Sequence, residues 1–225
     1  MIIEFIKKIG RYIAKNQPSQ IISDMDLEYL LWISNIYLRI KNIPGHIAEV
    51  GVYDGRNSVL FGKLIKLYNE QSVRQYIGFD TFEGFTERDL GRDGLLKVHK
   101  NKFKDCSLEG VKKRCFDNNV EDIVEFFKGD CVNSVPEILK NHKGKKFQKG
   151  HGKFALLYID CNAFFPAIES MQNFFPYMVP GGYIVIDEKK QWGETSAIIN
   201  FAKKHSLKIE RLGSNEVPMA LSIPN

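Results

Sequence analysis

The feature that most constrains the fold is a regular alternation of short apolar runs with amphipathic stretches. The runs have the length of buried strands, and the stretches between them carry apolar residues at helical spacing. This alternation is typical of an α/β fold in which helices cover both faces of a mostly parallel sheet. Strands are predicted at residues 46–50, 75–79, 123–127, 154–159 and 183–186, and helices at residues 57–69, 107–116, 135–141, 167–178 and 194–205.

The end of the chain is predicted to form an antiparallel hairpin. Residues 208–212 and 218–223 resemble strands, and the turn-forming Gly213-Ser-Asn215 joins them. The expected fold class is therefore a Rossmann-like doubly wound sheet, mostly parallel, with a C-terminal antiparallel hairpin. In such sheets ligands bind beyond the carboxyl ends of the strands, near the point where the strand order reverses.

Two further helices are predicted near the N-terminus from apolar residues at helical spacing, one within residues 1–13 and one that has Ser23 or Asp24 as its N-cap and ends before Ile43-Pro-Gly45. We expect residues 1–42 to cover a pocket or to contact a second subunit in a homodimer, and residues 43–225 to form the main domain. Charged residues interrupt the first apolar stretch, and no segment reaches transmembrane length. Neither a secretory signal nor a membrane partner is expected.

Charge and cysteine usage narrow the classes of function. The net charge of +5 comes from 32 basic and 27 acidic residues, an excess too small to indicate nucleic-acid binding. The four cysteines form neither a C-x-x-C pair nor a disulfide framework, so a cytoplasmic protein is expected. One basic segment, residues 140–153, contains six lysines. Such runs are usually solvated, but beside a cleft this one would attract a phosphorylated or nucleotide-linked molecule.

A glycine-containing turn follows the first predicted strand, with the sequence Glu49-Val-Gly-Val-Tyr-Asp-Gly55. Glycines between a strand and a helix let the backbone approach a ligand, although such a turn can also be purely structural. A dinucleotide fingerprint would need glycine where Tyr53 stands, which disfavours a pyrophosphate and hence an NAD enzyme.

Acidic residues end the second and third predicted strands. Asp80 can accept hydrogen bonds from both ribose hydroxyls of a nucleoside, so the two loops together fit an adenosine without a pyrophosphate. Asp130 can bind an adenine amino group or simply cap the helix that follows it.

Three more carboxylates, Asp160, Asp187 and Glu188, follow the fourth and fifth predicted strands. Carboxylates at neighbouring strand ends repel one another, so a cation or a shared proton is the natural compensation. A set of oxygen ligands suits Mg²⁺ or Ca²⁺ better than zinc. The alternative is that Glu188 points to solvent and Asp160 alone faces the pocket.

Five segments together carry a family resemblance. They are Pro44-Gly-His-Ile-Ala-Glu-Val-Gly-Val-Tyr-Asp-Gly55, Gly78-Phe-Asp-Thr-Phe-Glu-Gly84, Lys128-Gly-Asp130, Leu157-Tyr-Ile-Asp160 and Val179-Pro-Gly-Gly-Tyr-Ile-Val-Ile-Asp187. In order and spacing they resemble the macrocin O-methyltransferase (TylF/MycF) family. Its members are class I enzymes that use S-adenosylmethionine and Mg²⁺ to methylate sugar hydroxyls of natural products. The resemblance spans about residues 40–190.

The resemblance implies a role for each matching residue. The methionine part of the cofactor would lie against residues 49–53, the ribose against Asp80, the adenosine side against residues 81–84, and the adenine against Asp130 and Cys131. The cofactor-binding residues expected are Glu49, Gly51, Val52, Tyr53, Gly55, Asp80, Thr81, Phe82, Glu83, Gly84, Ser107, Asp130, Cys131 and Asp160. The metal ligands expected are Asp160, Asp187 and Glu188.

The resemblance also implies a mechanism. A Mg²⁺ ion bound by two vicinal oxygens of a small hydroxylated acceptor would stabilise the alkoxide, and Asp160 would take the proton. Asn162 stands where the family commonly has an acid, and Glu188 stands where it usually has aspartate. Two alternatives follow: methylation of a different acceptor, such as a nucleotide-linked sugar or a catechol, or a protein that binds S-adenosylmethionine without catalysis.

Overall fold

The computed structural model describes residues 24–93, 100–141, 152–187, 193–212 and 218–224. The chain divides into two units, Met1–Asn35 and Ile36–Asn225, and helix α2 (Asp24–Ile40) runs from one into the other. The helix expected within residues 1–13 lies outside the described residues. The second unit contains the sheet and is described below.

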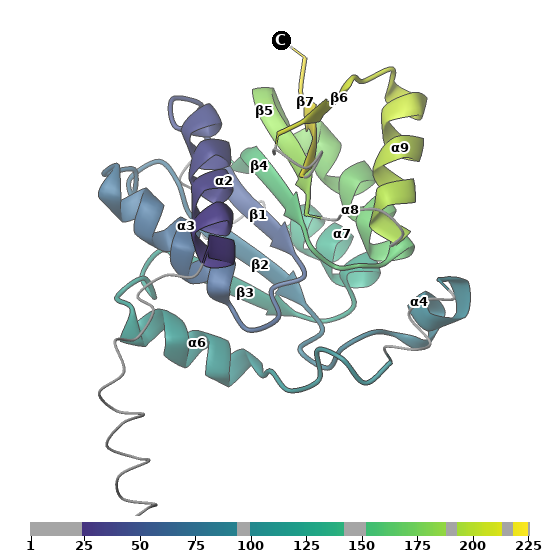
Figure 1. Ribbon diagram of the computed structural model, residues 1–225, viewed down its shortest axis with the longest axis horizontal. Coiled ribbons are helices and arrows are strands. Elements are labelled where there is room, and N and C mark those ends of the chain that lie inside the picture. Colours follow the sequence, from purple (N-terminus) through teal and green to yellow (C-terminus); the bar gives the residue numbers. More distant parts are fainter. Residues whose placement is uncertain (1–23, 94–99, 142–151, 188–192, 213–217, 225) are drawn as a thin grey trace, which may run out of the picture. The chain divides into compact units, whose positions relative to one another are not determined.

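A seven-stranded sheet forms the centre of the second unit, with the order β3-β2-β1-β4-β5-β7-β6 (Figure 1). The first five strands along the chain are parallel, while β7 runs antiparallel to both β5 and β6. The predicted fold class and the C-terminal antiparallel hairpin are therefore confirmed. The strands are β1 (His46–Val50), β2 (Tyr76–Asp80), β3 (Val124–Lys128), β4 (Phe154–Ile159), β5 (Met178–Ile186), β6 (Ile209–Arg211) and β7 (Met219–Ser222).

Helices cover both faces of the sheet. On one face lie α3 (Arg56–Leu67) and α6 (Leu108–Asp117), and on the other lie α7 (Cys131–Asn141), α8 (Phe164–Phe174) and α9 (Gly193–His205) (Figure 1). A 3₁₀ turn, Phe175–Tyr177, follows α8. The short helix α4 (Glu87–Arg92) lies beyond the carboxyl ends of the parallel strands, where it contacts α8.

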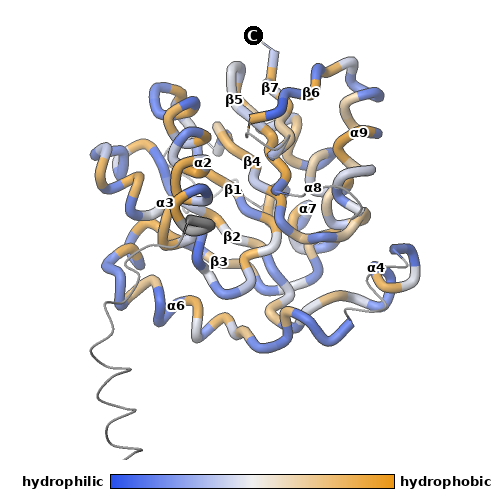
Figure 2. The backbone as a smooth tube through the Cα atoms, in the orientation of Figure 1, coloured by the Kyte–Doolittle hydropathy of each residue, from blue (hydrophilic) through white to orange (hydrophobic). Residues whose placement is uncertain are grey.

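Burial explains why the central strands were predictable. Every residue of β1 and β4 is buried, as expected for inner strands of a parallel sheet with both faces covered. Hydrophobic residues concentrate in these strands, whereas the helices alternate between hydrophobic and hydrophilic residues (Figure 2). Side chains of α8 and α9, among them Met171, Phe174 and Phe201, complete the core on one face of the sheet.

Several elements begin earlier than the sequence predicts, by five residues at β5, four at α7 and three at α8, which also ends at Phe174 rather than at residue 178. Helix α7 begins at Cys131 rather than at residue 135, because the Val132 N–H donates to Asp130 Oδ1 at 3.1 Å and starts the helix there. Strand β5 begins at Met178 rather than at residue 183, although Pro180 and two glycines interrupt it. A register irregularity in its pairing with β4 accommodates that interruption.

None of the helices within the described residues is both long and apolar enough to cross a membrane.

Candidate functional site

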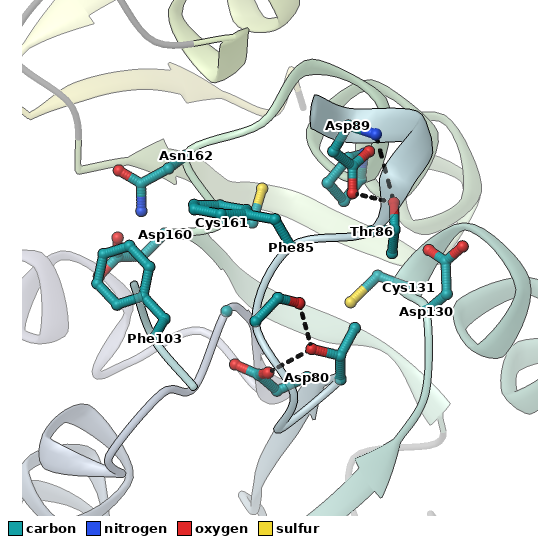
Figure 3. Close-up of a pocket in the computed structure, with 14 residues that line it drawn as sticks. Asp80, Phe85, Thr86, Asp89, Phe103, Asp130, Cys131, Asp160, Cys161 and Asn162 are labelled. Carbon is teal, nitrogen blue, oxygen red and sulfur yellow. Dashed lines mark hydrogen bonds between the residues drawn. The ribbon is translucent and has the colours of Figure 1, made fainter. Parts of the chain in front are cut away.

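A cavity opens where β1, β2, β3 and β4 end (Figure 3). Its empty volume is about 590 Å³, open solvent included. The lining residues are Gly51, Asp80, Thr81, Gly84, Phe85, Thr86, Asp89, Phe103, Asp130, Cys131, Asp160, Cys161, Asn162 and Pro166. The structure thus brings together seven of the predicted site residues: Gly51, Asp80, Thr81, Gly84, Asp130, Cys131 and Asp160.

Gly51 occupies a position that only glycine can fill. Its φ of 94° lies in the left-handed region, and a Cβ atom there would lie 2.0 Å from the carbonyl oxygen of Asp160. The missing side chain allows the loop after β1 to lie directly against the end of β4. The glycine turn recognised in the sequence therefore forms one wall of the cavity.

The Asp80 carboxylate holds two neighbouring loops in place. Its Oδ2 accepts hydrogen bonds from the N–H groups of Val52 at 2.7 Å and Tyr53 at 2.8 Å, and its Oδ1 accepts from the Phe82 N–H at 2.7 Å. A carboxylate has about four acceptor positions, so these bonds occupy most of them. A ribose bound to Asp80 would share this carboxylate with the loops.

Glu49 lies beneath the cavity rather than in its wall. Its side chain is fully buried and accepts hydrogen bonds from Asn57 Nδ2 at 2.6 Å and from the Tyr76 hydroxyl. Burial raises the pKa of Glu49 well above its ordinary value. The hydrogen bond from Asn57 opposes this rise, and the charge of Asp160 adds to it. The carboxyl group of Glu49 is therefore part of the internal support of the glycine turn.

The other residues expected to bind the cofactor are not in the cavity wall. Glu83 pairs with Lys128 at 2.7 Å on the surface, and the Ser107 hydroxyl accepts a hydrogen bond from the Gly110 N–H at 3.1 Å as the N-cap of α6. Tyr53 donates through its hydroxyl to Asp105 at 3.1 Å. The predicted cofactor residues outside the lining set are Glu49, Val52, Tyr53, Gly55, Phe82, Glu83 and Ser107.

Asp130 fulfils the capping role foreseen for it and also binds an arginine. Besides accepting from Val132, its two oxygens accept from Arg88 at 2.7 and 3.0 Å. Partial burial opposes ionisation of Asp130, but Arg88 and the Val132 N–H outweigh it and lower its pKa. Arg88, which reaches Asp130 from α4, 42 residues earlier in the chain, was not predicted from the sequence.

Asp160 and Asp187 interact at the ends of β4 and β5. Burial raises the pKa of Asp160 to about 8, and the negative charge of Asp187 and a hydrogen bond between the two acids act in the same direction. A carboxyl pair of this kind suits a shared proton or a divalent cation. Glu188, the third predicted metal ligand, lies outside the described residues. Within the described part of the chain, no group of three or more His, Cys, Asp or Glu side chains could hold a metal ion.

An aromatic wall that the sequence analysis did not identify closes one side of the cavity (Figure 3). The rings of Phe85 and Phe103 meet edge to face with centroids 5.6 Å apart, and Tyr53 packs on Phe103 at 5.1 Å. These contacts join segments that are distant in sequence, so no local pattern could have revealed them. The wall gives the cavity apolar surface in addition to its carboxylates.

The strand order and the cavity at the strand ends define a class I methyltransferase fold. A family model described as Macrocin-O-methyltransferase (TylF) matches residues 31–212. The chain belongs to that family, as its sequence motifs indicated.

Two similar proteins are O-methyltransferases of Streptomyces and Micromonospora. An 8-demethyl-8-(2,3-dimethoxy-alpha-L-rhamnosyl)-tetracenomycin-C 4'-O-methyltransferase of Streptomyces olivaceus is 23% identical over 154 residues, covering 65% of this chain and 53% of the relative. Mycinamicin III 3''-O-methyltransferase of Micromonospora griseorubida is 22% identical over 175 residues, covering 75% of this chain and 64% of the relative. The chain thus spans between about half and two thirds of the length of these relatives.

Solved structures share the fold over nearly the whole chain. The crystal structure of CalS11, a calicheamicin methyltransferase, matches with a TM-score of 0.74 and 23% identity, covering 94% of this chain and 89% of that one. The O-methyltransferase NovP matches with a TM-score of 0.73 and 17% identity, covering 92% of this chain and 84% of NovP. At these identities the similarity establishes the fold.

Proposed function

We propose that the protein transfers a methyl group from S-adenosylmethionine to a hydroxyl of a sugar or related small acceptor. The observation that carries this proposal is the juxtaposition, in one cavity, of the glycine turn at Gly51 with the half-buried acid Asp160. Membership of the macrocin O-methyltransferase family supports it. A cavity rich in carboxylates also suits a cofactor whose sulfonium is positively charged.

In the proposed complex, the cofactor lies along the ends of β1, β2 and β3. Its methionine part would lie against Gly51, its ribose near Asp80, and its adenine near Asp130 and Cys131. An adenine amino group that donates to Asp130 would compete with Arg88 for the same oxygens. Cofactor binding is therefore expected to rearrange the bonds made by α4.

Methyl transfer requires an acceptor oxygen in line with the bond between sulfur and the methyl group. In the proposed reaction the acceptor oxygen attacks the methyl carbon, its proton passes to Asp160, and S-adenosylhomocysteine leaves. A general base works best when its pKa lies near the working pH, and the pKa of about 8 fits Asp160 for that role. The protein thus aligns the oxygen and accepts its proton.

Asp160 and Asp187 would hold Mg²⁺ together with Glu188, which lies outside the described residues. When bound, such a cation lowers the pKa of a coordinated hydroxyl and orients it. The pairing of Asp160 with Asp187 favours this assignment, because a cation between the two acids would relieve their repulsion.

The acceptor is proposed to be a sugar unit of a natural product. One relative is named for a rhamnosyl-tetracenomycin and another for mycinamicin III. A nucleotide-linked sugar is the second candidate, because CalS11 is also described as a TDP-rhamnose 3'-o-methyltransferase. Residues 1–42 are proposed to cover the pocket or to contact a second subunit.

Calorimetric titration with S-adenosylmethionine and S-adenosylhomocysteine, with and without Mg²⁺, tests the cofactor. Micromolar binding is expected, and no binding under either condition would contradict the proposal. Incubation with methyl rhamnoside or TDP-rhamnose then tests the acceptor, with mass spectrometry to detect the added methyl group. Product formed equally well in EDTA would remove the metal from the mechanism while leaving methyl transfer intact.

A further inference from the structure

We propose that Glu194, which the mechanism above does not use, is a positioning residue for the turn that carries Asp160. Its catalytic consequence rests on the proposed function, whereas its structural role does not. Glu194 lies in the first turn of α9, and its side chain is fully buried. A buried carboxylate so close to the cavity needs an explanation, because burial of a charge is costly unless it is hydrogen-bonded.

The Glu194 carboxylate binds the backbone just beyond Asp160. Its Oε2 accepts hydrogen bonds from the N–H groups of Cys161 at 3.0 Å and Asn162 at 2.8 Å. These are the two residues that follow Asp160 at the end of β4, and Asn162 lines the cavity. Hydrogen bonds from N–H groups to a carboxylate are among the stronger ones in proteins.

The turn after Asp160 has a backbone that benefits from such support. Asn162 has a φ of 58°, in the left-handed region that few residues other than glycine adopt, although asparagine tolerates it better than most. Backbone of this kind persists when surrounding groups hold it in place. Glu194 supplies two of the bonds that hold it.

The start of α9 reaches this turn because Gly193 precedes Glu194. A Cβ atom at Gly193 would lie 2.2 Å from the backbone nitrogen of Phe164 and 2.9 Å from the carbonyl carbon of Ala163. The absence of a side chain therefore lets the first turn of α9 press against the first turn of α8. Gly193 provides the close approach, and Glu194 provides the hydrogen bonds.

The other side of Asp160 is fixed independently. Its N–H donates to the carbonyl oxygen of Val50 at 2.9 Å, and Gly51 packs against its carbonyl group. Loss of the Glu194 carboxylate should therefore disturb the segment from Asp160 to Asn162 and leave the Gly51 loop, which Asp80 holds, unchanged. We therefore expect the geometry on the acceptor side of the site to change and cofactor binding to stay the same.

Two substitutions separate the hydrogen bonds from the volume of the side chain. Glu194→Leu keeps a similar volume but removes both acceptors, whereas Glu194→Gln keeps an amide oxygen that can accept from both N–H groups. Ile199→Ala on the same helix, at a side chain that is 47% exposed, is the matched control. If Glu194→Leu does not fold, Glu194→Asp, which shortens the reach by one methylene, replaces it.

The first measurement is hydrogen exchange of the peptide that contains Cys161 and Asn162. In Glu194→Leu these amides should exchange at least about tenfold faster, because loss of about 1.4 kcal/mol of local stability corresponds to that factor. Calorimetric affinity for S-adenosylmethionine should stay within about twofold of the wild type. With a sugar acceptor, kcat should fall at least about tenfold in Glu194→Leu and remain near the wild-type value in Glu194→Gln and Ile199→Ala.

Unchanged exchange in Glu194→Leu, or wild-type kcat in that variant, would overturn the proposal. A parallel loss of cofactor affinity and kcat would also overturn it, because it would make Glu194 a support of the whole fold. If the wild type methylates no acceptor, the proposed function fails, and the exchange and affinity measurements still decide whether Glu194 holds this turn.

Discussion

Asp80→Asn is the substitution that best tests how the cofactor side of the site is built. The two carboxylate oxygens accept three backbone N–H groups at 2.7 to 2.8 Å, two on Oδ2 and one on Oδ1. An asparagine amide offers one oxygen and one NH₂ group. Whichever way the amide is turned, at least one backbone N–H then faces a donor and loses its acceptor.

The magnitude follows from the number of bonds lost. An N–H group left without an acceptor costs about 1 to 3 kcal/mol, and hydrogen bonds to charged groups contribute about 1.5 to 3 kcal/mol each. If the amide oxygen faces Val52 and Tyr53, the hydrogen bond from the Phe82 N–H is lost. In the opposite orientation, the hydrogen bonds from the Val52 and Tyr53 N–H groups are both lost. We therefore expect the free energy of unfolding to fall by about 1 to 3 kcal/mol, and affinity for S-adenosylmethionine to fall by about tenfold or more.

The assay combines thermal unfolding with calorimetric titration of S-adenosylmethionine. Glu83→Gln is the matched control, since Glu83 belongs to the same sequence motif but pairs with Lys128 on the surface. Exposed ion pairs contribute little, so this variant should bind the cofactor within about twofold of the wild type. Wild-type affinity in Asp80→Asn would refute the reasoning, because the cofactor loop would then not depend on the carboxylate.

Three further predictions concern other residues of the site. Asp160→Asn should bind S-adenosylmethionine normally but turn over at least about a hundredfold more slowly, measured as product formed, because it loses the proton acceptor. Gly51→Ala should unfold at much lower temperature in a calorimetric scan, because its Cβ would lie 2.0 Å from a backbone oxygen. Glu49→Gln should flatten the pH dependence of stability, followed by denaturant unfolding across a pH series. The pKa of Glu49 is raised on folding, so the contribution of Glu49 to wild-type stability is fully present below its ordinary value of 4.5 and is lost as pH rises through the folded-state pKa.

The parts of the fold that were predictable from sequence are those with a local cause. Strands β1 and β4 were predicted with the bounds observed, because strands buried on both faces are mostly apolar along their length. The start of β5 was missed because Pro180 and its glycines look like a break, whereas pairing with β4 carries the strand across them. Helix α4 was missed because its six residues are too few and too polar to show a period.

The candidate site shows the same division. Residues such as Asp130 and Asp160 could be expected at the cavity because parallel strands end at one edge of a sheet. The partner of each carboxylate could not be predicted from the sequence. Arg88 binds Asp130 across 42 residues of the chain. Glu194 binds the N–H groups of Cys161 and Asn162 across 33 and 32 residues. Pairings at such separations leave no periodic trace in the sequence.

The partners of the carboxylates also identify the residue best suited to accept a proton. Asp80 accepts backbone N–H groups, and Asp89 and Asp130 accept from Arg88. The Arg88 guanidinium and the Val132 N–H stabilise the ionised form of Asp130 and lower its pKa. Asp160 instead interacts with another acid, and its pKa is raised. Asp160 is therefore, unlike Asp130, an acid whose surroundings favour taking up a proton, while Asp80 keeps the cofactor loop in place.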